Sequence, residues 1–223
     1  MNILKSLAAL FAATTLLASC AGSTEDSLRT GDLIFVGIPV DYSLDEGSMS
    51  DAITSSTGNP DSLNIIHVAI AEVQGDSTWI IDATIKHGVD RHPVDTFFSD
   101  FTLRDGSLPV FIVKRLVDDS LAGAFVDKAK EYVGLAYDLY FMPDNDSLYC
   151  SELVRDSYVL DDGTCLFEAS PMNFRDADGE FPPYWTQLFG RLGVPIPQDV
   201  LGTNPQAMSA SPLLRTVNID ITR

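Results

Sequence analysis

The sequence predicts a single α+β domain built on an antiparallel β-sheet, because strand-like runs fill its first half and helical periodicity follows in its second half. The chain has 223 residues, of which 45% are hydrophobic and 21% charged, which is the composition of a globular protein. This length is enough for one compact domain with a full hydrophobic core. No internal repeat is visible.

Acidic residues dominate the charge of the chain. It has 14 Lys and Arg against 32 Asp and Glu, and its net charge is −18. Phosphate groups bind to clustered Lys and Arg, with release of counterions. The sequence therefore argues against nucleic acid and against an acidic membrane surface as partners.

Residues 1–19 are typical of an export signal. Lys5 precedes a short apolar run over Leu7–Leu17, and small residues follow it. The run is shorter than the roughly 20 residues of a membrane-spanning helix, which makes a permanent transmembrane anchor the weaker interpretation. Leu17-Ala-Ser-Cys20 resembles the lipobox of bacterial lipoproteins, in which the cysteine becomes the lipid-carrying N-terminus.

From this leader we expect a lipoprotein of the cell envelope that is anchored through Cys20. No Asp follows Cys20, which favours the outer membrane, on its periplasmic or surface side, over retention at an inner membrane. Residues 20–29 are small and polar and predict a flexible tether. Residues 30–223 then form the folded domain, which we expect to be a monomer that meets the membrane only through the N-terminal lipid.

Strands are predicted where short apolar runs are bounded by turn residues. Gln74–Ser77 is a hairpin signal between two such runs. The polar segment Asp41–Asn64 predicts a long surface loop beside the site, with Met49–Ile53 as a helical turn. The predicted strands are Leu33–Val36, Ile65–Val73, Thr78–Ala83 and Pro109–Arg115.

Helices are predicted in the second half of the chain. Apolar residues recur at helical spacing over Leu121–Val133, and Gly134 can end that helix. A second helix is expected to start after the polar cluster 143–147, which offers several capping residues, and to run through Cys150 to Asp161. The aromatic, Pro-rich segment that follows predicts a wrapping chain with one short helix at Tyr184–Leu192.

The strand Ile65–Val73 carries His67. Side chains alternate along a strand, so His67 shares a face with Ala69 and Ala71, which leaves room beside it or accommodates a crossing helix. If the hairpin turns at Gly75-Asp76, paired positions sum to 151, and Asp82 lies diagonal to His67 on the same face. Such a diagonal pair has Cβ atoms about 7 Å apart, so the Asp82 carboxylate can hold the His67 ring.

Cys150 lies at the start of a predicted helix. Unpaired backbone N–H groups and the helix dipole stabilise a thiolate there, and the same amides can receive an oxyanion. A thiol nucleophile also needs a base and a group that orients the base, which His67 and Asp82 supply. The alternatives are a buried structural cysteine and a disulfide with Cys165.

These residues carry a family resemblance through their order along the chain. The segments Gly31–Phe35, His67–Ile70, Ile81–Ala83 and Tyr149–Val154 resemble the YaeF/YiiX group of permuted papain-like enzymes in the NlpC-type superfamily. In that group the histidine strand precedes the cysteine helix. The resemblance implies a circularly permuted papain-like (NlpC-type) fold, with an antiparallel sheet or barrel packed with helices and a nucleophile at a helix N-terminus.

The resemblance also implies roles for individual residues. It makes Cys150 the nucleophile, His67 the base and Asp82 the third polar residue, although related enzymes often have Glu or His at the position of Asp82. Tyr137 and Tyr149 are expected to line the substrate pocket, with core packing as the other interpretation of Tyr149. The implied activity is that of a cysteine peptidase or amidase that forms a thioester and uses neither a metal nor an organic cofactor.

Cell-wall peptides are the substrate class that the superfamily implies, and two other functions stay open. One is acyl transfer or hydrolysis on lipids, as in lecithin:retinol acyltransferase, which predicts a wide apolar groove beside Cys150. The other is a non-catalytic binding lipoprotein in which Cys150 pairs with Cys165. His87 and His92 are interpreted as surface-loop histidines rather than metal ligands, and Asp144–Asp146 as helix capping rather than a calcium loop.

Overall fold

The computed structural model describes residues 27–42, 44, 47–57 and 63–222. The expected signal peptide, Cys20 and most of the tether lie outside the described residues. Within the described residues, no helix has the length and apolar character needed to cross a membrane. The elements are β1 Leu33–Pro39, α1 Met49–Thr57, β2 Leu63–Gln74, β3 Ser77–Thr84, β4 Gly88–Pro93, α2 Val94–Phe101, β5 Val110–Leu116, α3 Ala122–Glu131, β6 Ala136–Tyr137, β7 Ser147–Leu148, α4 Cys150–Ser157, β8 Ser170–Pro171, α5 Pro183–Leu192, β9 Leu201–Gly202, α6 Pro205–Ser209 and β10 Leu214–Val217.

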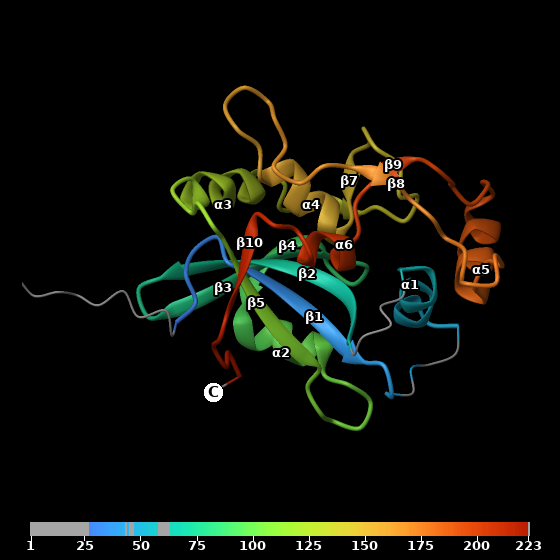
Figure 1. Cartoon of the computed structure of the whole chain (residues 1–223), viewed down its shortest axis with the longest axis horizontal. Coiled ribbons are helices and arrows are strands. Elements are labelled where there is room, and N and C mark those ends of the chain that lie inside the picture. Colours follow the sequence, from blue (N-terminus) through green and yellow to red (C-terminus); the bar gives the residue numbers. More distant parts are fainter. Residues whose placement is uncertain (1–26, 43, 45–46, 58–62, 223) are drawn as a thin grey trace, which may run out of the picture.

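One antiparallel sheet forms the centre of the molecule, in agreement with the predicted α+β class. Its strand order is β10-β5-β1-β2-β3-β4, and each neighbouring pair is antiparallel. Strands β2, β3 and β4 are consecutive hairpins, so the three segments lie side by side with short connections. Helices α3 and α4 cover one face of this sheet, and α2 covers the other (Figure 1).

Three apolar clusters hold the layers together. The first joins the sheet to α3 and α4 and includes Phe125 and Leu153. The second joins the other face of the sheet to α2 through Phe97. The third is mainly aromatic and joins α1 and α5 to the start of α4, with Trp185 as its largest member. The third cluster lies beyond the end of the sheet, on the side where α1 and α5 lie next to each other (Figure 1).

Several elements differ from the sequence prediction. Residues 88–93 form β4, where a loop around His87 and His92 was expected, because β4 is an edge strand that keeps polar side chains. Helix α2, which follows it, was not predicted. Helix α1 extends the single turn predicted within the long loop. Helix α4 begins at Cys150 rather than directly after 143–147, and it ends at Ser157 because Val159 pairs with Cys165.

The start of β1 carries a buried ion pair. Arg115 Nε and Nη2 donate to the two oxygens of Asp32 at 2.6 and 2.7 Å, and these side chains are both 1% exposed. Gly31 precedes this site at φ 86°, where a Cβ atom would come within 2.6 Å of Ala122. The Gly-Asp step therefore lets β1 approach α3 while Asp32 joins β1 to β5.

Replacing Asp32 with Asn should destabilise the fold, because it leaves the Arg115 guanidinium buried with a neutral partner. Removing one partner of a buried ion pair costs about 3 to 5 kcal/mol. Urea unfolding followed by circular dichroism should show a loss of about this size. Asp119→Asn is the matched control, since its carboxylate is half exposed, and it should change stability by less than about 0.5 kcal/mol. Equal stabilities for the two variants would contradict this role of the pair.

Candidate active site

Cys150 is the first residue of α4. Tyr149 precedes it in an extended conformation, with φ −94° and ψ 169°. The first bond of the helix runs from the Leu153 N–H to the Tyr149 carbonyl at 2.9 Å. The N–H groups of the residues before Leu153 point out of the helix start, because the first N–H groups of a helix lack intrahelical acceptors. Cys150 is 5% exposed, so its sulfur lies in a low-dielectric environment beside these donors.

His67 and Asp82 meet through the predicted hairpin register. The pairing of β2 with β3 runs from Ile70 opposite Ile81 to Gln74 opposite Ser77, so that paired numbers sum to 151 as expected. The His67 Nε2 atom lies 2.8 Å from Asp82 Oδ2. The register of β1 against β2 shifts beside His67, between Val36 and Gly37. Such a bulge redirects the neighbouring side chain.

The room expected beside His67 is occupied. Ala69 and Ala71 pack against Phe97 of α2 in the second apolar cluster, so the small residues accommodate a crossing helix. The His67 ring lies 4.6 Å from the Phe101 ring, measured between centroids. The open space of the site lies instead on the side of Cys150.

The surroundings of His67 favour its protonated form. Burial alone would lower its pKa, but the charge of Cys150 and hydrogen bonds with Asp82 and Cys150 raise the pKa of His67 to about 10. Because Nε2 faces Asp82, Nδ1 is the ring nitrogen left for the sulfur. An imidazolium in this position stabilises a negative sulfur at Cys150.

His92 was interpreted from the sequence as a surface histidine, and this interpretation is wrong. It is 6% exposed and lies on β4, opposite Ile80 of β3. Its Nε2 atom is 3.0 Å from Asp82 Oδ1, so Asp82 is bonded to two histidines. The missed signal was the third strand of the meander, which brings residue 92 back beside residue 82. His87 is exposed as expected and contacts Asp100.

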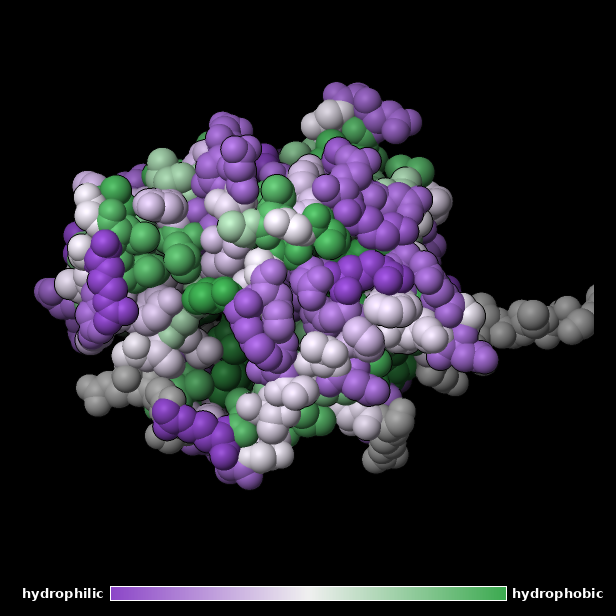
Figure 2. Space-filling model, turned by 180° about the vertical axis from the view of Figure 1, so that it is seen from behind, coloured by the Kyte–Doolittle hydropathy of each residue, from purple (hydrophilic) through white to green (hydrophobic). Residues whose placement is uncertain are grey.

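A cavity of about 330 Å³ opens beside Cys150. Tyr137 and Tyr149, which were expected to line a substrate pocket, both border it. None of its described lining residues is Asp, Glu, Lys, Arg or His, and aromatic side chains form much of its wall. The lining comprises Ile53, Ser56, Thr57, Ile66, Tyr137, Phe141, Tyr149, Cys150, Ser151, Pro171, Met172, Asn173, Phe174, Trp185, Thr203, Asn204, Pro205, Gln206 and Ala207. On the face opposite to that of Figure 1, hydrophobic residues gather around a hollow in the surface (Figure 2).

The segment 203–207 ties the cysteine helix to the histidine strand. The Thr203 N–H donates to the Tyr149 hydroxyl at 3.0 Å, and the Thr203 hydroxyl donates to Ser151 Oγ at 3.0 Å. Gln206 Oε1 accepts the N–H of Ile65 at 2.9 Å, two residues before His67. Tyr149 is therefore both a buried core residue and part of the cavity wall. Nothing in the sequence of segment 203–207 alone indicated this bridge.

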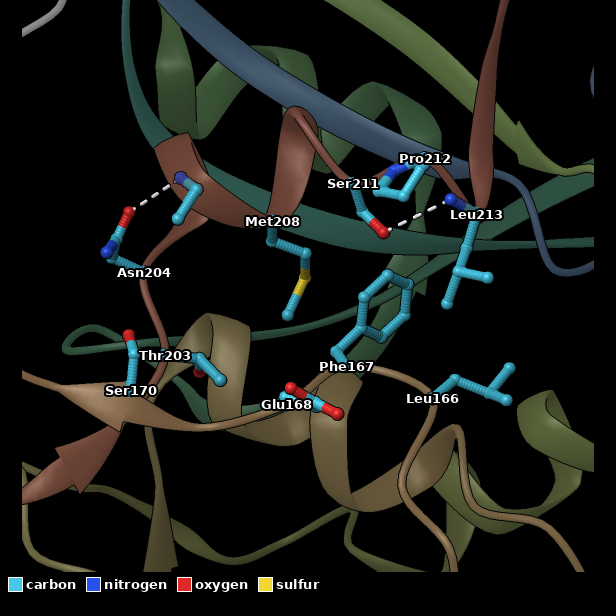
Figure 3. A pocket seen from close by; sticks show the side chains of 11 residues that line it. Leu166, Phe167, Glu168, Ser170, Thr203, Asn204, Met208, Ser211, Pro212 and Leu213 are labelled. Carbon is cyan, nitrogen blue, oxygen red and sulfur yellow. Dashed lines mark hydrogen bonds between the residues drawn. The ribbon is translucent and has the colours of Figure 1, made fainter.

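A second cavity of about 360 Å³ borders the same segment but does not include Cys150. It shares Thr203, Asn204 and Ala207 with the first cavity, and Met208 and Phe167 face its interior (Figure 3). Of these two cavities, only the first is bordered by Cys150.

Both cysteines in the described part of the chain are free thiols. Cys165 pairs with Val159, beyond the C-terminal end of α4, whereas Cys150 starts that helix. The disulfide alternative is therefore wrong. Among the described residues, no group of three or more His, Cys, Asp or Glu side chains could hold a metal ion. Residues Asp144–Asp146 form no such group either. The side-chain oxygen of Asn145 accepts the N–H of Ser147 in a local turn.

Glu152 lies in the first turn of α4, where a negative charge would interact favourably with the helix dipole. Burial, together with the charges of Asp138 and Asp156, raises the pKa of Glu152 from 4.5 to about 8. Its Oε2 atom accepts the N–H of Tyr149 at 3.4 Å. Glu152 is thus a neutral acid near pH 7 and contributes little negative charge to the helix start.

Two comparisons relate this chain to known proteins. The model of the YaeF/YiiX C92 family, described as permuted papain-like amidases, matches residues 27–218. Among solved structures, the crystal structure of metalloprotein YiiX from Escherichia coli O157:H7 is similar, with 25% sequence identity and a TM-score of 0.64 over 86% of this chain and 97% of that chain. No curated protein matches this chain.

Glu152→Gln should stabilise the protein in a pH-dependent way. The folded protein holds the Glu152 proton up to about pH 8 while the unfolded chain releases it near 4.5. Stability of the wild type therefore falls between these values, and the variant should gain on it progressively over that range. Thermal unfolding across this range measures the effect. Glu168→Gln, at an exposed carboxylate, is the control, and a constant Glu152→Gln difference would contradict the raised pKa.

His67→Asn should slow alkylation of Cys150 by iodoacetamide at neutral pH. Loss of the imidazolium removes the charge that stabilises the thiolate, and one pKa unit corresponds to about a tenfold change in thiolate. Peptide mass spectrometry after timed labelling gives separate rates for Cys150 and Cys165. The Cys165 rate is the internal control and should not change. An unchanged Cys150 rate would show that the two groups are uncoupled.

Proposed function

This chain belongs to the C92 family of permuted papain-like amidases, and from that premise we propose that it hydrolyses an amide bond by nucleophilic attack of Cys150. His67 and Asp82 complete the proposed triad. The observation that carries the proposal is the buried contact of His67 with Asp82 at 2.8 Å beside a cysteine at a helix start. The His67 ring also has Cys150 as a hydrogen-bond partner, which is the contact that a base makes with its nucleophile.

In the proposed first step, the Cys150 thiolate attacks the substrate carbonyl carbon. The proton already resides on His67 at rest, so attack does not wait for its removal from the thiol. As the tetrahedral intermediate collapses, the imidazolium gives that proton to the leaving nitrogen. The amine departs, and the acyl group remains on sulfur as a thioester.

In the second step, neutral His67 takes a proton from water, and the resulting hydroxide attacks the thioester carbonyl. The carbon–sulfur bond breaks, the acid is released and the thiolate–imidazolium pair is restored. Asp82 stabilises the charged ring in the resting enzyme and holds it in one orientation. This is the role of the acid in a nucleophile–histidine–acid arrangement.

The oxyanion in both steps is assigned to the N–H groups at the start of α4 and to the Tyr137 hydroxyl. Burial, followed by the charge of Cys150, raises the pKa of Tyr137 well above its ordinary value. Tyr137 therefore stays protonated and can donate a hydrogen bond to developing negative charge. Tyr149 is less suited to this role because its hydroxyl donates to Met172 Sδ at 3.8 Å.

The proposed reaction uses no metal. The related YiiX structure is described as that of a metalloprotein. In this chain, however, the polar atoms of Asp82 are bonded to His67 and His92, and no group of three or more suitable side chains within the described residues could hold an ion. These residues do not fit a resident metal, and every step above is carried by protein groups.

The substrate class is proposed from the location and from the cavity. An envelope lipoprotein anchored through Cys20 would meet cell-wall peptides, which are the first candidate. The uncharged, aromatic lining of the cavity favours a second candidate, an amide or ester of an apolar acyl group, as in lipid-directed acyl chemistry. Burying an ionised group against such walls is costly, whereas an alkyl chain gains about 0.8 kcal/mol per buried CH₂.

Two substrate sets test the proposal and separate the candidates. Purified muropeptides report cleavage of cell-wall peptides by mass spectrometry, and 4-nitroanilides from acetyl to octanoyl report amide cleavage as a function of acyl length. Cys150→Ala should reduce turnover on the order of 10⁴-fold or more without changing the unfolding transition. Asp82→Ala should reduce it less, on the order of 10²-fold.

The outcomes are distinct. Cleavage of muropeptides alone supports the cell-wall candidate, and a rate that rises with acyl length supports the apolar candidate. Trp185→Ala should flatten that length dependence, because Trp185 forms part of the cavity wall. Full activity of Cys150→Ala on either set would end the proposal.

A further inference from the structure

Asp82 is held by two histidines rather than one. His67 Nε2 contacts Asp82 Oδ2 at 2.8 Å, and His92 Nε2 contacts Asp82 Oδ1 at 3.0 Å. The three side chains come from three adjacent strands and are 8%, 7% and 1% exposed for His67, His92 and Asp82. Each carboxylate oxygen therefore has its own histidine.

The bond from His92 restricts how Asp82 can turn. A carboxylate held at one oxygen can rotate about its side-chain bonds, whereas one held at both oxygens has a fixed plane. The strand register supplies this second contact, because Asp82 lies opposite Asp90 and Ile80 lies opposite His92. His92 thus reaches Asp82 diagonally from the far side, just as His67 does from β2.

Both ring nitrogens of His92 face oxygen acceptors. Nδ1 lies 3.3 Å from the Pro93 carbonyl oxygen, and Nε2 faces the Asp82 carboxylate. Neither oxygen can donate, so both contacts are satisfied together only by a doubly protonated ring. Although burial opposes the charge, the bond and charge of Asp82, the Pro93 carbonyl and the charge of Asp90 raise the pKa of His92.

The remaining titratable neighbour does not compete for these contacts. The ring centroid of His87 is 6.3 Å from that of His92, and His87 Nε2 contacts Asp100 of α2. His67 is bonded to Asp82 and lies beside Cys150. The charges thus alternate from the proposed thiolate through His67 and Asp82 to His92.

We propose that His92 is a positioning residue of this enzyme, which fixes the Asp82 carboxylate so that His67 keeps its ring nitrogen toward Cys150. The inference rests on the proposed function and adds His92 as a supporting residue to the proposed triad of Cys150, His67 and Asp82. His92 touches neither substrate nor sulfur in this arrangement. It acts only through Asp82.

The test measures the alkylation of Cys150 by iodoacetamide as a function of pH in His92 variants of the full chain. His92→Leu removes both donors at similar volume and should slow alkylation at neutral pH about tenfold or more, because small misplacements of a reacting pair have large effects on rate. The pH of half-maximal alkylation should rise, since a loosely held imidazolium stabilises the thiolate less. His92→Gln keeps one donor at a similar reach and should restore most of the rate.

Two control variants show whether slower alkylation comes from a displaced Asp82, from unfolding of the protein or from the loss of any nearby histidine. His92→Asn carries the same amide as His92→Gln on a shorter side chain that does not reach Asp82, so it should slow alkylation as His92→Leu does. It also replaces His92→Leu as the test variant if the leucine variant does not fold. His87→Leu removes a nearby histidine that does not contact Asp82 and should leave both the rate and the pH profile unchanged. Nitrogen-15 NMR of the wild type should show His92 protonated at both ring nitrogens at neutral pH.

Equal rates for wild type and His92→Leu would overturn the proposal, as would equal impairment of His92→Gln and His92→Leu or a neutral His92 ring. Failure of the proposed function is recognised separately. In that case Cys150→Ala would keep its amide turnover, or His67→Asn would alkylate as fast as the wild type, whatever the His92 variants do.

Discussion

The Asp82 carboxylate is the constraint on which the geometry of the candidate site depends. It is 1% exposed, and an unpaired carboxylate at that depth would carry a desolvation cost of several kcal/mol. Its two oxygens are satisfied from opposite sides by strands β2 and β4. A slip of one residue in either pairing would turn a histidine to the other face of the sheet and leave the charge unpaired. The buried acid therefore selects the register of three strands at once.

The second constraint joins this sheet to the cysteine helix. Strands β2 to β4 can place two histidines around an acid without any help from α4, but the sulfur comes from a distant part of the chain. Segment 203–207 bonds to Tyr149 and Ser151 at the helix start and, through Gln206, to the backbone of β2. Gly202 lets the chain pass close to these groups, since a Cβ atom there would come within 2.5 Å of Met172 Sδ and 2.7 Å of the Tyr149 hydroxyl. The C-terminal segment thus sets the spacing between helix and strand.

The sequence could predict the first constraint, the register of the sheet, but not the second, the bridge from segment 203–207 to the cysteine helix. Side-chain alternation along a strand and residue pairing across a hairpin turn are local rules. They therefore placed His67 and Asp82 on one face of the sheet in the observed register. A helix near Cys150 followed from local pattern as well, but it begins at Cys150 rather than directly after residues 143–147, and its capping residue was not predicted. His92 was missed because an edge strand with polar residues has no apolar alternation to reveal it. The bridge through Thr203 was missed because it depends on contacts between segments about 50 residues apart, which no local pattern encodes.

The cavity without acidic or basic side chains and the net charge of −18 together limit which substrates can bind. The field of such a surface disfavours the approach of anionic substrates, and the cavity itself offers no charged side chain that could bind one. The Asp82 carboxylate is bonded to His67 and His92, and His67 also contacts Cys150, so these groups already have partners. A substrate portion that enters the cavity must therefore be held by shape and apolar contact, with polar guidance limited to hydroxyl, amide and backbone groups. Any ionised part of the substrate is best accommodated outside the aromatic wall. This argument supports recognition of an uncharged acyl portion at the proposed thiolate, with the leaving amine directed toward solvent.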